Sequence, residues 1–198
     1  MNRLLLSLFF IAVAPSLAVA QASPANGDRG STELALEYNY VRANAPPAQC
    51  DCFSLNGGSF SIAQSLGSGH LAAVFDAAAV HGSGIGSSGY DLTLSSFTAG
   101  LRYRPLLHPR WNLFGQILIG AANASGTLVE GNTPAASDST LNFASVVGGG
   151  LDYRLHGRWS LRVIEGDYLL TRSSNRVNDH QNNLRLGAGI VYRFGQPR

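Results

Sequence analysis

The sequence predicts an all-β protein, an eight-stranded, up-and-down antiparallel transmembrane β-barrel. Three observations lead to this prediction. Eight segments alternate apolar and polar residues with a period of two, which is the period of a β-strand. Short and long connections alternate between these segments. The charged residues of the segments fall mainly on the face opposite to the apolar residues.

Residues 1–20 form a predicted secretory signal peptide, and residues 21–198 form one predicted barrel domain. Arg3 supplies a positive start, Leu4 to Ala14 are almost all apolar, and Ala18-Val19-Ala20 is a small-x-small cleavage site. The apolar run is too short to cross a bilayer, which requires about 20 residues. We therefore expect this segment to be removed on export.

Alternation is clearest in the first and last predicted strands. In residues 31–41, the apolar face carries Leu34, Leu36, Tyr38 and Tyr40. In residues 183–194, apolar side chains again occupy every second position as far as Phe194. The second strand has the weakest pattern, because Gln64 falls on its apolar face. The six strands predicted between the first and the last are residues 57–66, 70–80, 92–104, 111–122, 142–154 and 159–171.

The connections place the two ends of the barrel. Short turns are predicted at residues 66–70, 105–110 and 155–158, and long Gly/Ser/Asn-rich loops at 43–56, 81–91, 123–141 and 172–182. Such alternation is typical of an up-and-down meander. In a transmembrane barrel the short turns face the periplasm and the long loops face outside. An even number of strands then places both chain ends in the periplasm.

Two short repeats mark the turn end of the predicted barrel. Gly-Leu/Ile-x-Tyr-Arg occurs at residues 100–104, 150–154 and 189–193, and Arg-Trp-x-Leu occurs at 110–113 and 158–161. We expect Tyr103 and Trp111, and likewise Tyr153 and Trp159, to share the apolar face and to form a ring at the short-turn edge. Aromatic residues at strand ends are typical of a membrane–water boundary.

The charges indicate which face points inward. A soluble ligand carrier hides its apolar face inside, whereas a transmembrane barrel turns that face to lipid. Simple alternation would expose Glu165 and Asp167 to hydrocarbon, at a cost of about 2 kcal/mol or more each. We therefore predict a β-bulge near Ile164 that turns both inward and turns Tyr168 and Leu170 outward. The lumen-facing charges would then be Glu33, Glu37, Asp76, Asp152, Glu165, Asp167, Arg102, Arg104, Arg154, Arg162, Arg185 and Arg193.

These charges predict a filled lumen. An eight-stranded barrel is just wide enough for its own side chains, and buried charges persist only when paired. We expect Arg102, Asp152, Arg162 and Arg185 to form an ionic plug. Arg104 and Arg193 lie near the strand ends and are expected to sit in water at the barrel mouth.

The signal ending AVA, the eight alternating strands and the closing strand NLRLGAGIVYRF resemble the small outer-membrane β-barrel family, typified by the OmpA transmembrane domain. The resemblance covers nearly all of the chain after the signal. It implies residence in the cell outer membrane and contact with outer-membrane lipids and lipopolysaccharide. It also implies recognition of the C-terminal strand, through Tyr192 and Phe194, by the outer-membrane assembly machinery. We expect a monomer.

Composition excludes several other classes. The formal net charge is +2 and no Lys- or Arg-rich run occurs, which argues against a nucleic-acid partner. Cys50 and Cys52 are too few ligands for zinc, and export favours a tight loop disulfide between them, which would require a sharp turn. We assign no catalytic, cofactor-binding or metal-binding residues.

The predicted role is therefore structural, with the outer loops presented for surface interaction and no open pore. One alternative is a lipid A-modifying enzyme. Its nucleophile and base would be Ser83 and His81, with Asp91 as the orienting acid. A second alternative is a soluble, secreted, eight-stranded ligand binder. We expect no enzyme activity, since His-x-Ser arises easily by chance in a Ser-rich loop.

Overall fold

The computed structural model describes residues 30–43, 53–67, 70–85, 90–107, 110–130, 133–172 and 181–195. It contains eight strands: β1 (Thr32–Ala43), β2 (Phe53–Leu66), β3 (Leu71–Ile85), β4 (Tyr90–Leu107), β5 (Trp111–Glu130), β6 (Thr133–His156), β7 (Trp159–Thr171) and β8 (Gln181–Phe194). The predicted signal peptide, Cys50 and Cys52 lie outside the described residues. No helix long and apolar enough to cross a bilayer occurs in the part of the chain that is described.

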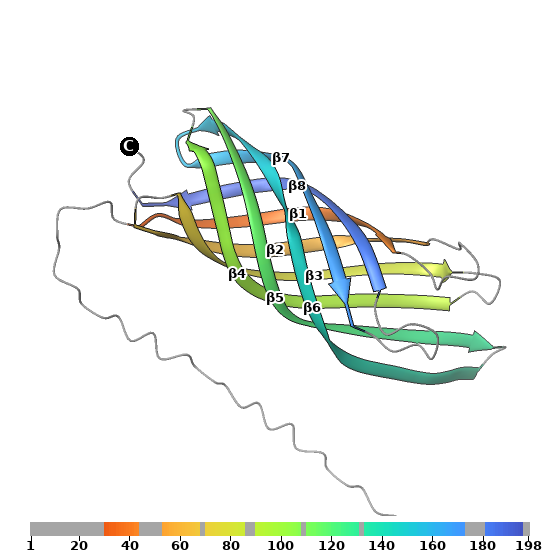
Figure 1. Ribbon diagram of the computed structural model, residues 1–198. Helices are drawn as coiled ribbons and strands as arrows, with labels where there is room; N and C mark the ends of the chain where they lie inside the picture. Colours follow the sequence, from red (N-terminus) through yellow and green to blue (C-terminus); the bar gives the residue numbers. More distant parts are fainter. Residues whose placement is uncertain are drawn as a thin grey trace, which may run out of the picture.

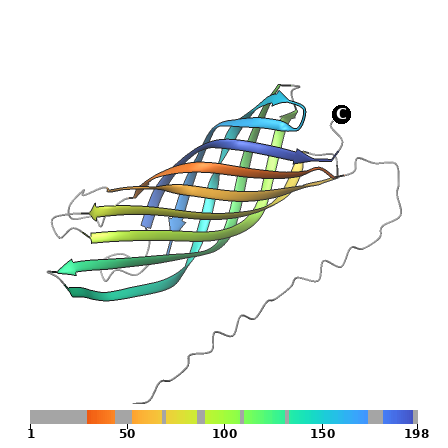
Figure 2. The same ribbon diagram turned by 180° about the vertical axis from the view of Figure 1, so that it is seen from behind.

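The eight strands close into a single antiparallel barrel in chain order, which confirms the predicted fold class. Each strand pairs with its neighbours in sequence, and β1 pairs with β8 to complete the ring. Leu36 lies opposite Ile190 and Glu37 lies opposite Gly189, so the first and last strands close in matching phase. Figures 1 and 2, which view the barrel from opposite sides, show that the strands run obliquely around it.

The strands extend further toward the long loops than the sequence predicts. Residues 123–141 are predicted to be a loop, yet β5 continues to Glu130 and β6 starts at Thr133. Backbone pairing runs through this region, with Ser125 opposite Ser139. Beyond the membrane, small polar residues can pair as strands without an apolar face, so the pattern that identifies a lipid-facing strand is absent there. The predicted loops at 43–56 and 81–91 are shortened in the same way by β2, β3 and β4.

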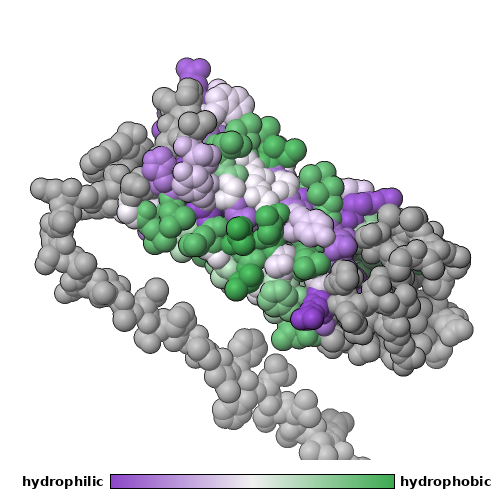
Figure 3. Space-filling model, in the orientation of Figure 1, coloured by the Kyte–Doolittle hydropathy of each residue, from purple (hydrophilic) through white to green (hydrophobic). Residues whose placement is uncertain are grey.

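The apolar face points outward, as predicted. Leu36, Phe75 and Ile117 are 56%, 45% and 62% exposed on the barrel exterior. Figure 3 shows hydrophobic side chains gathered over the middle of the barrel. Gln64, which interrupts the pattern of β2, is also exposed and accepts a hydrogen bond from Thr32 near the turn end. A soluble ligand carrier would require the opposite arrangement.

Aromatic residues gather on the outer face at the turn end, as predicted. Trp111 lies opposite Tyr153 with ring centroids 4.6 Å apart, and Trp159 contacts Tyr192 at 4.7 Å. The pairs therefore join β5 to β6 and β7 to β8, rather than joining strands across the short turns. Tyr103 lies opposite Gly115 instead. The stagger of tilted strands moves each Trp past the Tyr that precedes it in the chain.

We expect the fluorescence of both tryptophans to be strongly quenched by brominated lipids in reconstituted vesicles. Trp111 and Trp159 are 43% and 48% exposed on the outer face, at the end of the barrel that we expect to lie at a membrane–water boundary. Bromine near the headgroup should quench more than bromine at the chain end. A Trp111→Phe variant isolates the signal of Trp159. Emission that is insensitive to brominated lipid would contradict the assignment of this face to lipid.

Candidate functional site

The lumen contains a buried network centred on Arg162 of β7, whose side chain is completely buried. Its Nη1 donates to Glu37 Oε1 at 2.6 Å and to Glu165 Oε2 at 2.7 Å, and its Nε donates to Asp152 Oδ1 at 2.8 Å. The three carboxylates come from β1, β6 and β7. Arginine suits this position because its planar guanidinium can serve several acceptors at once.

A second buried arginine, Arg185 of β8, occupies the other side of the network. It donates to Asp76 Oδ1 at 2.8 Å and to Asp167 Oδ2 at 2.6 Å. Gln116 of β5 joins the two halves, because its Nε2 donates to Glu165 Oε1 at 3.0 Å and to Asp167 Oδ1 at 3.2 Å. The network therefore crosses the lumen from wall to wall.

Arg102 is held by an uncharged acceptor and an aromatic ring. Its Nη2 donates to Gln116 Oε1 at 2.8 Å, and its guanidinium lies 4.1 Å from the centre of the Phe114 ring. Arg162 lies 4.6 Å from the centre of the same ring. Cation–π attraction to a buried ring can contribute about 2 kcal/mol, which helps two like charges share this space.

The predicted bulge in β7 is confirmed. The pairing of β7 with β8 shifts between Arg162 and Glu165, and Val163 and Ile164 are both exposed. The extra residue turns Glu165 and Asp167 into the lumen, where they are 4% and 1% exposed. Tyr168 and Leu170 return to the outer side, as expected.

The prediction that Arg104 and Arg193 merely sit in water at the barrel mouth is wrong. Both donate to Glu33 of β1, and Arg104 is only 4% exposed. The side chain of Arg193 is 16% exposed and forms its ion pair from the rim. The Glu33 carboxylate lies at the same level of the tilted barrel, so it and these two arginines form a second ionic group nearer the turn end. Arg154, also predicted to face inward, is half-buried.

We call these two groups of inward-facing polar side chains together the ionic plug; it comprises Glu33, Glu37, Asp76, Arg102, Arg104, Gln116, Asp152, Arg162, Glu165, Asp167, Arg185 and Arg193. Glycine makes room for it. A Cβ on Gly148 would lie 2.1 Å from Asp167 Oδ1, and a Cβ on Gly187 would lie 2.9 Å from Glu37 Oε2. Inward-facing glycines thus provide the space that the carboxylates of Asp167 and Glu37 occupy.

Apolar side chains fill other parts of the lumen, a feature that sequence reasoning missed. Leu118, Val146 and Leu169 form one buried cluster with residues of β2 and β3. Val41, Leu55 and Val80 form a second cluster near the loop ends of the first three strands. The signal was present in β3, where Val74 and Val80 occupy inward positions beside Asp76. Ionic and apolar side chains thus fill different parts of the described lumen.

Arginine is the main partner of the carboxylates in the lumen. Most carboxylates of the ionic plug are already bonded to arginine, and no three His, Cys, Asp or Glu side chains among the described residues are placed to share a metal ion.

Known structures share this architecture. Ail, the attachment invasion locus protein of Yersinia pestis, matches with a TM-score of 0.58 and 18% identity over 83% of this chain and 99% of Ail. Neisserial surface protein A matches with a TM-score of 0.56 and 12% identity over 82% of this chain and 97% of that protein. A major outer membrane protein of Thermus thermophilus matches with a TM-score of 0.54 and 14% identity, over 82% of this chain and 99% of that one. The chain has the fold of the small outer-membrane β-barrels. No known family pattern and no curated protein sequence matches it.

This fold confirms the predicted type of barrel, and the apolar exterior agrees with residence in the outer membrane. The solved structures to which the chain is similar are outer-membrane barrel proteins rather than typical enzymes.

The residues of the alternative enzyme site lie together at the loop end of β3 and β4. His81 and Ser83 are both exposed, on the outer side of the barrel wall. His81 Nδ1 shares a hydrogen bond with Thr93 Oγ1 at 2.9 Å, whereas Asp91 Oδ1 accepts from the backbone N–H of Gly84 at 3.1 Å. The imidazole and the carboxylate are thus committed to different partners. This geometry does not supply the aligned nucleophile, base and acid that acyl transfer requires, and the absence of enzyme activity stays a prediction.

Proposed function

We propose that this protein is a non-porin barrel of the outer membrane that binds a macromolecular partner at the cell surface through its loop-end strands. The observation that carries the proposal is the length of the β5–β6 hairpin. The last pair between β6 and β7 joins Ala144 to Thr171, but β6 begins at Thr133. Figure 1 shows β5 and β6 extending past the neighbouring end of β7.

Residues 133–142 therefore continue the wall, paired to β5, beyond the last described contact of β6 with the chain after β7, where the Arg172 N–H donates to Phe143 O. At about 3.4 Å per residue, this segment reaches roughly 35 Å along the strand direction. On its other side β5 pairs with β4 as far as Thr127 opposite Asp91. Because this backbone is already held in paired strands, it supplies a preformed surface. Binding a partner there would cost less conformational entropy than binding through a free loop, which would first have to become ordered.

The filled lumen supports the non-porin half of the proposal. In planar bilayers we expect no steady ohmic current of porin size from the purified protein, because charged and apolar side chains occupy the barrel interior. The measurement is single-channel conductance, with a large porin inserted into the same membrane as the positive control. A reproducible current of porin size from the folded protein would overturn this half of the proposal.

The surface-binding half is tested by shortening the hairpin. Replacing residues 125–139 with Asn-Gly would join Ala124 to Thr140, which are already paired, through a two-residue turn. We expect bacteria that display the shortened protein to lose adhesion to a panel of immobilised glycoproteins and polysaccharides. The heat-dependent gel mobility of the folded barrel should be retained. Arg158→Ala, at the opposite end of the barrel, serves as the control.

Unchanged adhesion after the hairpin is shortened would show that binding does not involve it. Adhesion of the parent strain no greater than that of cells without the protein would reject the surface-binding role. Attachment is the activity in the name of Ail, and the fold permits a role of that kind here. The support for this role from the chain itself is the length of the β5–β6 hairpin.

Two further parts of the proposal concern membrane assembly. Tyr192 and Phe194 end β8 with ring centroids 4.7 Å apart, and Phe194 is exposed on the outer side. We propose that this pair forms the C-terminal signal for the outer-membrane assembly machinery and that the barrel acts as a monomer. Export through residues 1–20, ahead of a barrel domain at 21–198, belongs to the same proposal.

A further inference from the structure

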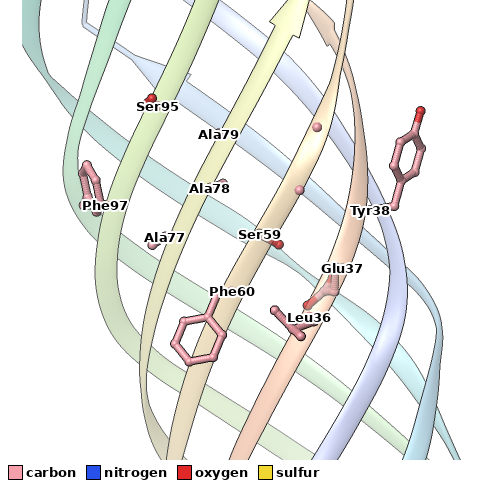
Figure 4. Close-up of a pocket in the computed structure, with 12 residues that line it drawn as sticks. Leu36, Glu37, Tyr38, Ser59, Phe60, Ala77, Ala78, Ala79, Ser95 and Phe97 are labelled. Carbon is pink, nitrogen blue, oxygen red and sulfur yellow. The ribbon is translucent and has the colours of Figure 1, made fainter.

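The outer wall of β1 to β4 contains an apolar groove of about 690 Å³. Its floor comes from small residues that face outward, among them Gly58, Ala77 and Ala79. Large side chains form its walls, and Figure 4 shows Tyr38, Phe60 and Phe97 standing around Ala77 and Ala79. This volume falls within the range of roughly 300–1,000 Å³ that is usual for small-molecule sites.

The groove results from two adjacent rows of paired residues. In one row, Tyr38, Gly58, Ala79 and Ser95 lie side by side across four strands. In the next row toward the turn end, Leu36, Phe60, Ala77 and Phe97 do the same. Small residues occupy positions at which a uniform lipid-facing wall would carry Leu or Phe. A space with apolar walls on the membrane face fits a hydrocarbon chain.

A groove alone does not select a lipid, because acyl chains are as apolar as the wall itself. Selection requires polar contacts where the hydrocarbon ends, and such contacts lie directly beyond the groove. The next outward row toward the loop end contains Tyr40, Asn56, His81 and Thr93, paired side by side. Tyr38 Oη donates to Asn56 Oδ1 at 2.8 Å, which links the groove to this polar row.

A cation completes the polar end. Arg42 is exposed on the outer side of β1, and its Nη1 donates to Ser54 Oγ at 3.1 Å. Tyr40 Oη bonds to the same Ser54 oxygen at 2.8 Å, so the side chains of Tyr40 and Arg42 are both held by Ser54. If this end of β1 lies at the level of the lipid headgroups, the other guanidinium donors of Arg42 are accessible to them. A guanidinium at that depth matches a phosphate, which it can bind through charge-assisted hydrogen bonds.

A second groove on the barrel provides an internal comparison. It measures about 610 Å³ and is formed by β4, β5 and β6, with Ala99, Leu101 and Ile117 among its lining residues. No charged side chain is among the described residues that line it, and Tyr103 marks its proximity to the turn end. It can accept an acyl chain from the inner leaflet, but it offers no cation for a headgroup.

We propose that the β1–β4 groove is a specific site for lipid A, the acylated and phosphorylated glycolipid of the outer leaflet. One acyl chain would lie between Tyr38, Phe60 and Phe97, and a phosphate would bind Arg42. The loop end of the strands faces the outer leaflet, where this lipid resides. The inference is independent of the surface-binding role of the β5–β6 hairpin.

The test is native mass spectrometry of the purified, folded barrel in mild detergent, with hexa-acylated lipid A and phosphatidylethanolamine added in competition. We expect one lipid A to be retained in preference to the phospholipid. Ala79→Leu should fill the groove and weaken retention about tenfold, and Arg42→Ala should weaken it by a similar factor through loss of the phosphate contact. Ala99→Leu, which fills the second groove, should leave retention unchanged.

Equal retention of lipid A by the parent protein and by Ala79→Leu would overturn the proposal, as would equal retention of lipid A and phosphatidylethanolamine. Heat-dependent gel mobility verifies that each variant is folded, and Ala77→Leu replaces Ala79→Leu if the latter does not fold. A bound lipid A that lacks one acyl chain, seen in the parent but not in Ser83→Ala, would support the site and make it a substrate site.

Discussion

Replacing Arg162 with methionine is expected to lower the free energy of unfolding by about 3–5 kcal/mol, the usual cost of removing one partner from a buried ion pair. The substitution keeps a long side chain but leaves Glu37, Asp152 and Glu165 without their shared donor. Guanidinium unfolding of the protein refolded in micelles, followed by tryptophan fluorescence, measures the change.

Two controls separate the loss of charge pairing from a general effect of substitution. Arg158→Ala removes an exposed arginine from the turn between β6 and β7 and should change stability by no more than about 0.5 kcal/mol. Adding Asp152→Asn to Arg162→Met should restore part of the loss, because it removes one unpaired buried charge. If the free energy of unfolding of Arg162→Met lies within about 1 kcal/mol of that of the parent protein, the ionic plug does not stabilise the barrel.

Gly148→Ala is expected to be nearly as damaging, with a loss of about 3 kcal/mol or failure to reach the folded, heat-modifiable form. The new Cβ would lie 2.1 Å from Asp167 Oδ1 and 2.3 Å from the carbonyl oxygen of Gly166. The second contact is with backbone, so relief requires β6 and β7 to separate. Refolding yield on a gel and guanidinium unfolding both report the effect.

Gly115→Ala is the matched control, because Gly115 lies on the outer side of the neighbouring strand. The nearest atom to its added Cβ is Gly148 O at 3.7 Å, an ordinary van der Waals distance. We expect this variant to fold with unchanged or slightly higher stability, since alanine loses less backbone entropy on folding. Equal damage from the two alanines would show that strand flexibility, rather than lumen space, is what glycine provides here.

It could be predicted that the apolar face points outward, because the alternation of residues and the positions of the charges both place the charged side chains on the opposite, inner face. The β7 bulge followed from Glu165 and Asp167, since any other phase would place two carboxylates in hydrocarbon. The error over Arg104 has a different origin. Sequence phase gives the face of a residue but not its height, and height decides whether Glu33 of another strand lies beside it. Tilt and stagger of the strands set that height.

Other features could not be predicted from the sequence, because the alternation of apolar and polar residues ends at the membrane boundary. The sequence of the β5–β6 extension is mostly small or polar and does not alternate, so it shows no pattern that distinguishes a strand from a loop. The lipid A groove was missed for another reason. Gly58, Ala79 and Ser95 are far apart in the chain and form one row only when three strands are set in register. Each residue taken singly is an ordinary small residue in a strand.

The ionic plug also bears on the order in which the barrel can be built. Arg162 and Glu37 lie 125 positions apart in the chain, and Arg185 and Asp76 lie 109 apart. Neither pair can meet until the hairpins curl around and β8 docks against β1. A sheet that still lacks β8 would have unpaired carboxylates on its concave face and strand edges with unpaired backbone N–H and C=O groups. Both are unfavourable in the hydrocarbon of the bilayer. Completion of the chain, closure of the barrel and insertion into the bilayer are therefore expected to be coupled events, in which Arg185 and Arg193 of β8 are the last arginines to reach their carboxylates.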